Sequence, residues 1–150
     1  VSRLMASGKP IRVVVLDTQV YSNTGGQACT SGFHGQISDM AAYGAARHGK
    51  EENRKEMSLI AMAHRGTYVL QSSQALPSHM IGVVLRGLGS RRPAIFNIYS
   101  PCQAEHGLPD HGSATAAKLA LASKMSGCWS TSASGGTTRP AGCRCRWARA

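Results

Sequence analysis

The sequence lacks any long hydrophobic run, although 42% of its 150 residues are hydrophobic. A membrane-spanning helix needs about 20 consecutive apolar residues, so we expect no membrane partner. The opening segment is too short and too polar for a signal peptide. Five cysteines, an odd number without regular spacing, predict no disulfide framework. A reduced cytoplasmic setting is the simplest assignment.

Acidic residues are scarce, with 7 Asp and Glu against 17 Lys and Arg, and none lies beyond residue 123. Residues 124–150 hold three of the five cysteines and both tryptophans, with no periodicity. That composition is typical of disorder. We therefore divide the chain into one domain over 1–123 and a disordered basic tail over 124–150. An abrupt change of this kind is also what a shifted reading frame of GC-rich DNA produces, and we hypothesise a frameshift.

The stretch from Ile11 to Gln27 organises the rest of the chain. Five of its first six residues are aliphatic, which predicts a strand buried on both faces of a parallel sheet. From Asp17 onward the side chains are polar, and two glycines follow. Ligands bind in the crevice beyond the carboxyl ends of such strands. The alternative is a turn whose polar residues serve only local hydrogen bonds.

The polar loop offers chemistry that suits a magnesium–phosphate group. Mg²⁺ prefers hard oxygen ligands in octahedral geometry at about 2.0–2.1 Å, and phosphates complete its shell. The hydroxyl of Thr18 and the main-chain carbonyl of residue 20 can turn toward one point. Gly25 and Gly26 let backbone N–H groups approach an anion.

Strands and helices alternate after this loop. The patterns predict strands over 67–71 and 94–99 and helices over 39–47, 53–64, 77–88 and 113–123. Ser38 and Ser113 are the expected N-caps of two of these helices. The order predicts an α/β fold, a parallel sheet flanked by helices and joined by right-handed crossovers.

The segment from Asp17 to Gln27, Asp-Thr-Gln-Val-Tyr-Ser-Asn-Thr-Gly-Gly-Gln, resembles the thiamine-diphosphate loop of the pyruvate:ferredoxin (flavodoxin) oxidoreductases, the 2-oxoacid:acceptor oxidoreductase family. The similarity continues discontinuously to about residue 123. It implies an incomplete thiamine-diphosphate-binding fold. In that family an upstream Gly-Asp-Gly segment supplies a metal-binding aspartate, and no such segment precedes residue 17 here. We therefore interpret the chain as a fragment.

The resemblance implies roles for the loop residues. Thr18 and the carbonyl of Val20 join an upstream aspartate and the diphosphate around Mg²⁺. Asn23 faces cofactor and substrate, where its amide can orient a 2-oxoacid. Asp17 belongs to the cofactor-binding loop, and we favour a structural role in which it holds loop N–H groups. Cofactor contacts are also implied for Tyr21, Ser22, Thr24, Gly25, Gly26 and Gln27.

Cys102, in Ser-Pro-Cys-Gln-Ala-Glu-His-Gly after a predicted strand, is a second candidate site residue. The resemblance implies that it is the remote fourth ligand of a [4Fe–4S] cluster, for which a thiolate is suitable. The other three ligands would come from outside this chain. A small buried thiol is the alternative for Cys102 and the preferred interpretation of Cys29. Cys143 and Cys145 lack a matching pair, so no zinc site is predicted.

The implied activity is oxidative decarboxylation of a 2-oxoacid such as pyruvate to acyl-CoA, with electrons passing through iron–sulfur clusters to ferredoxin or flavodoxin. Coenzyme A is a substrate, and the remaining portion of the enzyme or a partner subunit is required. We therefore expect this chain alone to be inactive. Two alternatives stay open: a non-enzymatic basic module that binds nucleic acid through its tail, and an unstable pseudogene-like fragment. No nucleic-acid-binding motif supports the first.

Overall fold

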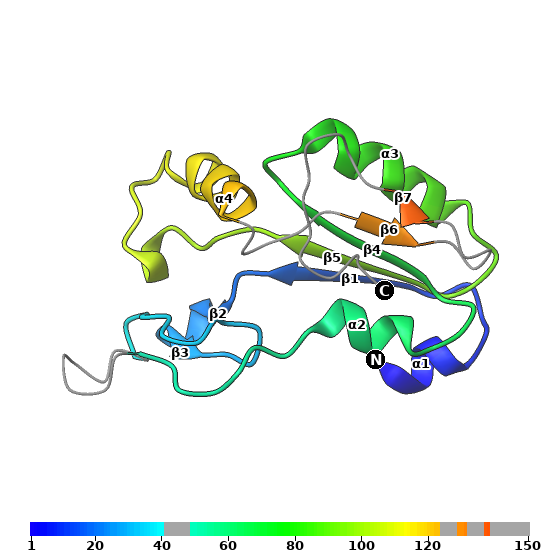
Figure 1. Cartoon of the computed structure of the whole chain (residues 1–150), viewed down its shortest axis with the longest axis horizontal. Helices are drawn as coiled ribbons and strands as arrows, with labels where there is room; N and C mark the ends of the chain where they lie inside the picture. The colour runs from blue at the N-terminus through cyan, green and yellow to red at the C-terminus, as the bar shows by residue number, and fades with distance from the viewer. Residues whose placement is uncertain (41–48, 124–128, 132–136, 139–150) are drawn as a thin grey trace.

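The computed structural model describes residues 1–40, 49–123, 129–131 and 137–138, which form a sheet flanked by helices (Figure 1). The elements in chain order are α1 (Ser2–Ala6), β1 (Arg12–Asp17), β2 (Val20–Tyr21), the 3-10 helix η1 (Ser22–Thr24), β3 (Gln27–Ala28), α2 (Met57–Met62), β4 (Tyr68–Ser73), α3 (Pro77–Leu88), β5 (Ala94–Tyr99), the 3-10 helix η2 (Ala104–His106), α4 (Ser113–Ala122), β6 (Trp129–Thr131) and β7 (Thr137–Thr138).

Three parallel strands form the centre of the fold. β5 lies between β1 and β4, in the order β1-β5-β4-β6-β7. Asp17, Tyr99 and Ser73 share one register at the carboxyl ends of these strands. The three carboxyl ends therefore meet at one edge of the sheet. This arrangement confirms the predicted α/β fold with a parallel sheet flanked by helices.

Two short antiparallel strands extend the sheet beyond β4. β6 pairs with β4, and β7 pairs with β6. The sequence predicts no strand after residue 123, so this pairing is an addition to the predicted sheet. All six residues of β4 are buried, and a neighbouring strand satisfies backbone groups that water does not reach. The rest of the predicted tail, including Cys143 and Cys145, lies outside the described residues.

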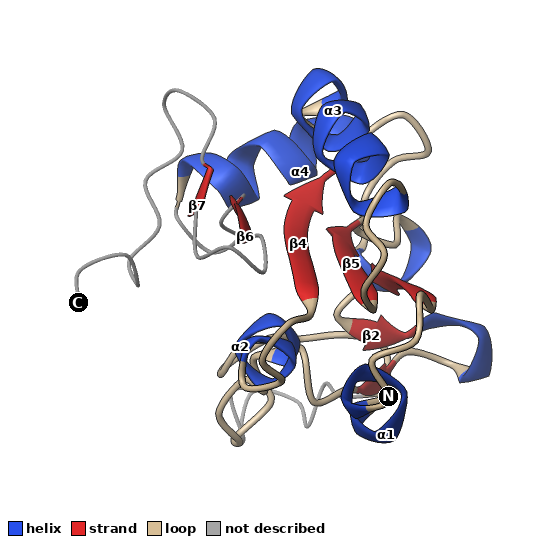
Figure 2. Ribbon diagram, turned by 90° about the vertical axis from the view of Figure 1, so that its right-hand side faces the viewer, coloured by secondary structure: helices blue, strands red, loops and turns tan. Residues whose placement is uncertain are grey.

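Helix α3 covers one face of the sheet (Figure 2). Pro77 begins it, at a position where its missing N–H costs no hydrogen bond. Val83 of α3 packs with Tyr68, Leu70 and Phe96, which are almost completely buried. The Tyr68 hydroxyl also donates to the carbonyl oxygen of Val83 at 2.8 Å. These contacts place the predicted 77–88 helix on the two inner strands.

Helices α1 and α2 cover the opposite face of the sheet (Figure 2). Met5 of α1 and Ala61 of α2 pack against Val69 and Ile95, which are completely buried. Each inner strand therefore contributes alternate side chains to two separate cores, as its period of two residues requires.

β1 is the edge strand of the described sheet, so the expectation that it is buried on both faces is wrong. Val13 and Val15 pack on the core formed with α1 and α2. Val14 and Leu16 point to the face covered by α3, yet they are 60% and 67% exposed. The reason is that α3 packs on β4 and β5. An aliphatic run thus predicted the strand but not its place in the sheet.

Two predicted helices differ from the structure. The helix expected over 53–64 is α2, Met57–Met62, because Arg54 and Glu56 lie before it in a polar cluster. The helix expected over 39–47 falls largely on 41–48, outside the described residues. Its expected N-cap, Ser38, is buried and donates its hydroxyl to the carbonyl oxygen of Gly26 at 2.6 Å.

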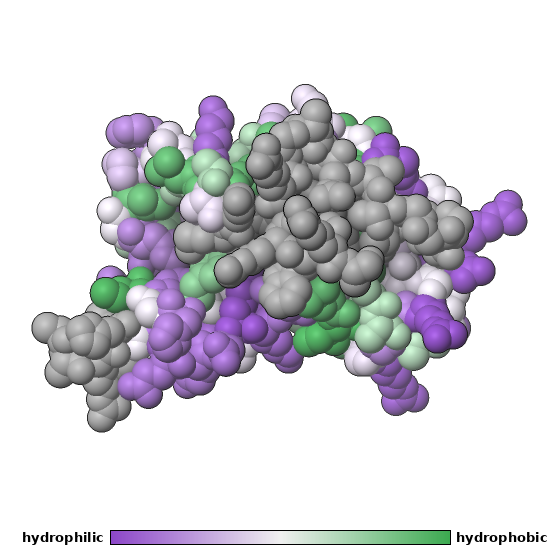
Figure 3. All heavy atoms as spheres, in the orientation of Figure 1, coloured by the Kyte–Doolittle hydropathy of each residue, from purple (hydrophilic) through white to green (hydrophobic). Residues whose placement is uncertain are grey.

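Apolar side chains remain at the surface of α2. Leu59, Ile60 and Met62 are each partly exposed, and the surface over α2 is hydrophobic in Figure 3. Within the described part of the chain, no helix has both the length and the apolar character that a membrane crossing demands.

Candidate functional site

The polar loop after β1 folds into a small two-stranded ribbon at the carboxyl edge of the sheet. Val20 in β2 pairs with Ala28 in β3, and η1 forms the bend between the two strands. Gly25 and Gly26 have φ values of 109° and 72°, which residues with a Cβ rarely adopt. The glycine pair is therefore what allows this bend to close.

Two oxygen atoms selected from the sequence meet in this loop. The Thr18 hydroxyl donates to the carbonyl oxygen of Val20 at 2.8 Å. Gln19, between them, has a φ of 61° and is only 4% exposed. This left-handed conformation is uncommon for a residue other than glycine. A backbone conformation that few residues adopt thus brings the two oxygens together.

Both backbone polar groups of Gln19, its N–H and its carbonyl oxygen, are held by hydrogen bonds. Its N–H donates to Asp17 Oδ1 at 3.2 Å. Its carbonyl oxygen accepts a hydrogen bond from Gln36 Nε2 at 2.8 Å, and Gln36 Oε1 accepts one from the N–H of Phe33 at 3.0 Å. A segment distant in sequence therefore fixes the conformation of the loop.

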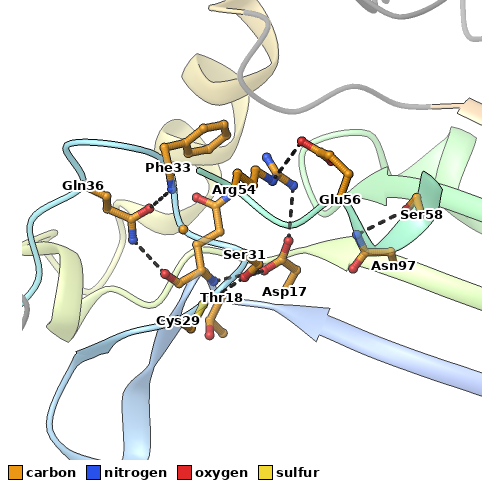
Figure 4. Close-up of polar contacts among 12 residues, drawn as sticks. Asp17, Thr18, Cys29, Ser31, Phe33, Gln36, Arg54, Glu56, Ser58 and Asn97 are labelled. Atoms are coloured by element: carbon orange, nitrogen blue, oxygen red, sulfur yellow. Dashed lines mark hydrogen bonds and ion pairs between the residues drawn. The ribbon is translucent and has the colours of Figure 1, made fainter. Parts of the chain in front are cut away.

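The carboxylate of Asp17 is the centre of a buried polar cluster (Figure 4). The Ser31 hydroxyl donates to Asp17 Oδ1 at 2.6 Å. Arg54 Nη2 lies 3.5 Å from Asp17 Oδ2. Both carboxylate oxygens thus have partners, and one of these partners is the N–H of the loop residue Gln19.

Arg54 contacts two further groups besides Asp17. Its side chain is about one-tenth exposed, and its Nε lies 3.4 Å from Glu56 Oε1. Its Cζ lies 4.6 Å from the centroid of the Phe33 ring. The sequence did not single out Arg54 or Ser31, since neither belongs to a motif and both are far from Asp17 along the chain.

The pKa of Tyr99, at the carboxyl end of β5, responds to the charges of Asp17 and Arg54. Burial of its side chain raises the pKa of the Tyr99 hydroxyl above its ordinary value. The Asp17 carboxylate raises this pKa further, whereas the Arg54 guanidinium lowers it. The phenol therefore lies within the field of both members of the ion pair.

The loop after β5 packs against the loop after β1. His106 Nε2 donates to the carbonyl oxygen of Thr18 at 2.9 Å. A Cβ added to Gly26 would collide with Glu105 Oε2. That oxygen atom is buried and has no hydrogen-bond partner within the described part of the chain. Buried polar atoms without a partner are rare, and a bound water or ion is one way to satisfy them. The sequence did not single out Glu105.

Cys102 lies near the start of this second loop, three residues after the end of β5. It is a free thiol and half-buried, whereas the free thiol of Cys29 is buried. Among the residues that the structure describes, no three His, Cys, Asp or Glu side chains are arranged to hold a metal ion. Within the described ranges, therefore, no other side chains join Cys102 to form a set of cluster ligands.

The remaining residues of the predicted cofactor loop fall into three groups. Thr24 and Gln27 bond to each other, because the Thr24 hydroxyl donates to Gln27 Oε1 at 2.6 Å and Gln27 Nε2 donates to the Thr24 carbonyl at 2.7 Å. Tyr21 and Asn23 are exposed. The Ser22 hydroxyl is buried and has no partner among the described residues.

Sequence comparison relates the chain to one segment of much larger enzymes. It is 33% identical over 105 residues to mitochondrial pyruvate dehydrogenase (NADP+) of Euglena gracilis, over 70% of this chain and 6% of that protein. It is also 33% identical over 106 residues to pyruvate:ferredoxin oxidoreductase of Moorella thermoacetica, over 70% of this chain and 8% of that protein. No family model matches the sequence. The chain thus spans less than a tenth of these relatives.

Structural comparison relates the fold to that of a 2-oxoacid oxidoreductase. A 2-oxoglutarate:ferredoxin oxidoreductase from Magnetococcus marinus, solved with 2-oxoglutarate, coenzyme A and succinyl-CoA bound, superposes with a TM-score of 0.62. The sequence identity is 18%, and the match covers 76% of this chain and 36% of that one. At this identity the match establishes a shared fold.

Proposed function

We propose that this chain, which is homologous to one segment of the pyruvate:ferredoxin and pyruvate-flavodoxin oxidoreductases, forms the magnesium–diphosphate side of a thiamine-diphosphate site in a 2-oxoacid oxidoreductase. The observation that supports this most directly is the convergence of Thr18 and Val20 at the carboxyl edge of the sheet. That edge is where open parallel sheets bind their ligands.

The separation of the two oxygens suits a magnesium ion. Thr18 Oγ1 and the Val20 carbonyl oxygen lie 2.8 Å apart. Two neighbouring ligands of an octahedral Mg²⁺ lie about 2.9 Å apart when each bond is about 2.0–2.1 Å. Thr18 and Val20 would hold the metal through these two oxygens, once the Thr18 hydroxyl hydrogen turns away. A hydroxyl and a carbonyl are hard oxygen donors of the kind that Mg²⁺ prefers.

The diphosphate would lie beside the glycine bend. The Ser22 hydroxyl is a buried donor that has no partner within the described ranges, and a phosphate oxygen is an acceptor that can satisfy it. The side chain of Asn23 is exposed at the same bend. Its amide both donates and accepts hydrogen bonds, which suits orientation of a 2-oxoacid.

Thiamine diphosphate, when bound, supplies the electron sink that 2-oxoacid decarboxylation requires. The contribution of the chain is to hold the metal through Thr18 and Val20 and to orient the substrate through Asn23. Cys102 is proposed as one ligand of a [4Fe–4S] cluster whose other ligands lie outside this chain. Coenzyme A and a ferredoxin or flavodoxin are the proposed acyl and electron acceptors.

We propose that the rest of the enzyme, or a partner subunit, completes this site. Neither Thr18 nor Val20 offers a carboxylate to the metal. The carboxylate of Asp17 is already bonded to Ser31, Gln19 and Arg54. The chain on its own is then a binding module that positions the cofactor without turning over substrate.

Titration calorimetry of the purified chain with thiamine diphosphate tests the proposal. We expect saturable binding in the presence of Mg²⁺ that is lost when EDTA removes the metal. Thiamine monophosphate is the matched control ligand, since it lacks the second phosphate, and it should bind at least tenfold more weakly. Absence of binding at saturating Mg²⁺ would overturn the proposed cofactor site.

A turnover assay tests the requirement for the rest of the enzyme. Purified chain is mixed with Mg²⁺, thiamine diphosphate, pyruvate, coenzyme A and a viologen acceptor, and we expect no reduction of the dye. Robust reduction by the chain alone would show that it needs no further polypeptide.

A further inference from the structure

We propose that Arg54 is a positioning residue for the metal side of the loop, acting through Asp17 and Gln19. This inference rests on the proposed function, because it concerns the same two oxygens. Arg54 does not contact them directly. It holds the carboxylate that in turn holds the residue between them.

The first step is the attachment of Arg54 itself. Its guanidinium lies between Asp17 and Glu56, at 3.5 Å and 3.4 Å, and above the Phe33 ring. A planar guanidinium can engage a carboxylate and stack on an aromatic ring at the same time, which an ammonium group cannot do. These contacts leave the side chain about one-tenth exposed and fixed in direction.

The second step runs from Asp17 to the loop. Arg54 pairs with Oδ2, and the other oxygen, Oδ1, accepts the N–H of Gln19 and the hydroxyl of Ser31. Gln19 adopts its left-handed conformation between Thr18 and Val20. A rarely populated backbone conformation persists only when its surroundings hold it. Rotation of the Asp17 carboxylate would break one of the two hydrogen bonds that hold the backbone of Gln19.

Charge gives Arg54 a second effect on the same site. Asp17 is buried, and it is the last residue of β1, the strand that leads to the proposed diphosphate site. Without Arg54 this buried negative charge would be unpaired and would repel the incoming anion. Arg54 therefore both orients the loop and offsets part of the negative charge beside it.

A role limited to folding is the competing explanation, and the variants are chosen to separate the two. Arg54→Met keeps the length and apolar stem of the side chain but removes its charge and its donors. Arg54→Lys keeps the charge without the planar fork. Arg12→Met is the matched control, because the Arg12 guanidinium donates to the carbonyls of Leu88, Ser90 and Arg92 beyond the opposite end of β1.

Amide hydrogen exchange of the cofactor-free chain is the first measurement. In Arg54→Met we expect exchange across residues 18–28 to rise at least tenfold while the amides of β4 and β5 stay within twofold of wild type. Arg54→Lys should fall between the two, and Arg12→Met should leave 18–28 unchanged. Unchanged exchange at 18–28 in Arg54→Met overturns the inference. An equal rise across loop and sheet also overturns it, since that is the result of a folding role alone.

Affinity for Mg²⁺–thiamine diphosphate is the second measurement. We expect the dissociation constant to rise at least tenfold in Arg54→Met and to stay unchanged in Arg12→Met. Equal affinity in wild type and Arg54→Met overturns the inference while the proposed function stands. Absence of binding by the wild-type chain refutes the proposed function instead, and hydrogen exchange then decides whether Arg54 orders the loop.

Discussion

Gly87 of α3 lies directly against the ring of Phe96 of β5. A Cβ added to Gly87 would overlap Phe96 and would come within 2.7 Å of Tyr68 Cε1. The two rings are themselves packed, with centroids 6.3 Å apart and an angle of 55° between their planes. The absence of a side chain at residue 87 therefore sets how closely α3 approaches the sheet.

Gly87→Ala should destabilise the fold by about 1–3 kcal/mol, the usual range for overpacking a core. Urea denaturation followed by circular dichroism measures this change. Gly82→Ala on the same helix is the matched control, because no atom lies within 4 Å of its added Cβ. It should raise stability by up to about 1 kcal/mol through helix propensity. Equal effects at both positions would contradict the observed packing.

Thr18→Val should weaken binding of Mg²⁺–thiamine diphosphate at least tenfold, which corresponds to about 1.4 kcal/mol. The valine keeps the shape of threonine but removes the oxygen that would bind the metal. Calorimetric titration in the presence of Mg²⁺ is the measurement. Thr115→Val, at an exposed position of α4, is the control and should bind as wild type does. Full affinity in Thr18→Val would remove Thr18 from the proposed ligand set.

Leu70→Ala should lower the free energy of unfolding by about 2–5 kcal/mol, because it leaves a cavity at a completely buried position. Leu16→Ala makes the same chemical change at a side chain that is 67% exposed. Its cost should stay below about 1 kcal/mol, in the range of ordinary surface substitutions. Denaturant midpoints of the two variants provide the comparison. A large loss in Leu16→Ala would show that the outer face of β1 is covered.

Acidification should destabilise the chain through His79. Burial, and secondarily the charge of Arg86, lowers the pKa of His79 below its ordinary value of 6.5. The unfolded chain therefore binds this proton more readily than the folded chain. The contribution is fully present above about pH 6.5 and is lost as the pH falls toward the lower pKa of the folded state.

The urea midpoint measured between pH 8 and pH 5 tests this dependence. His79 Nδ1 lies 3.2 Å from Ser72 Oγ, and His79→Gln retains a polar side chain that does not titrate. The midpoint of His79→Gln should fall less steeply below pH 6.5 than that of wild type. Identical slopes would assign the acid sensitivity to other groups.

Prediction from sequence worked best where the information is local. The helix expected over 77–88 and the strand expected over 94–99 match α3 and β5, since each has a strong periodic pattern and a clear stop. The expected strand over 67–71 continues to Ser73. Its last residues are polar, and hydrogen bonding within the sheet keeps them extended although their composition suggests a loop.

The same distinction between local and long-range information applies to the candidate site. The sequence points to Thr18 and Val20 because the polar composition and the family resemblance both lie in the one short segment that contains them. The sequence does not point to Arg54, Ser31 or Glu105, because each meets the loop through a contact between separate parts of the chain. No local pattern distinguishes an arginine that will pair with Asp17 from one that faces solvent.

The sequence by itself determined the order of the three parallel strands and of helices α2, α3 and α4, and the position of a polar, glycine-containing loop after the first strand. Hydrophobic periodicity and chain-breaking residues encode these features within a few residues. Tertiary structure decided that β1 lies at the edge of the described sheet with one apolar face exposed. It also decided that the segment containing Arg54 holds Asp17 and Gln19 at the loop. Burial and ion pairing depend on which distant groups meet, and that is settled only when the chain folds.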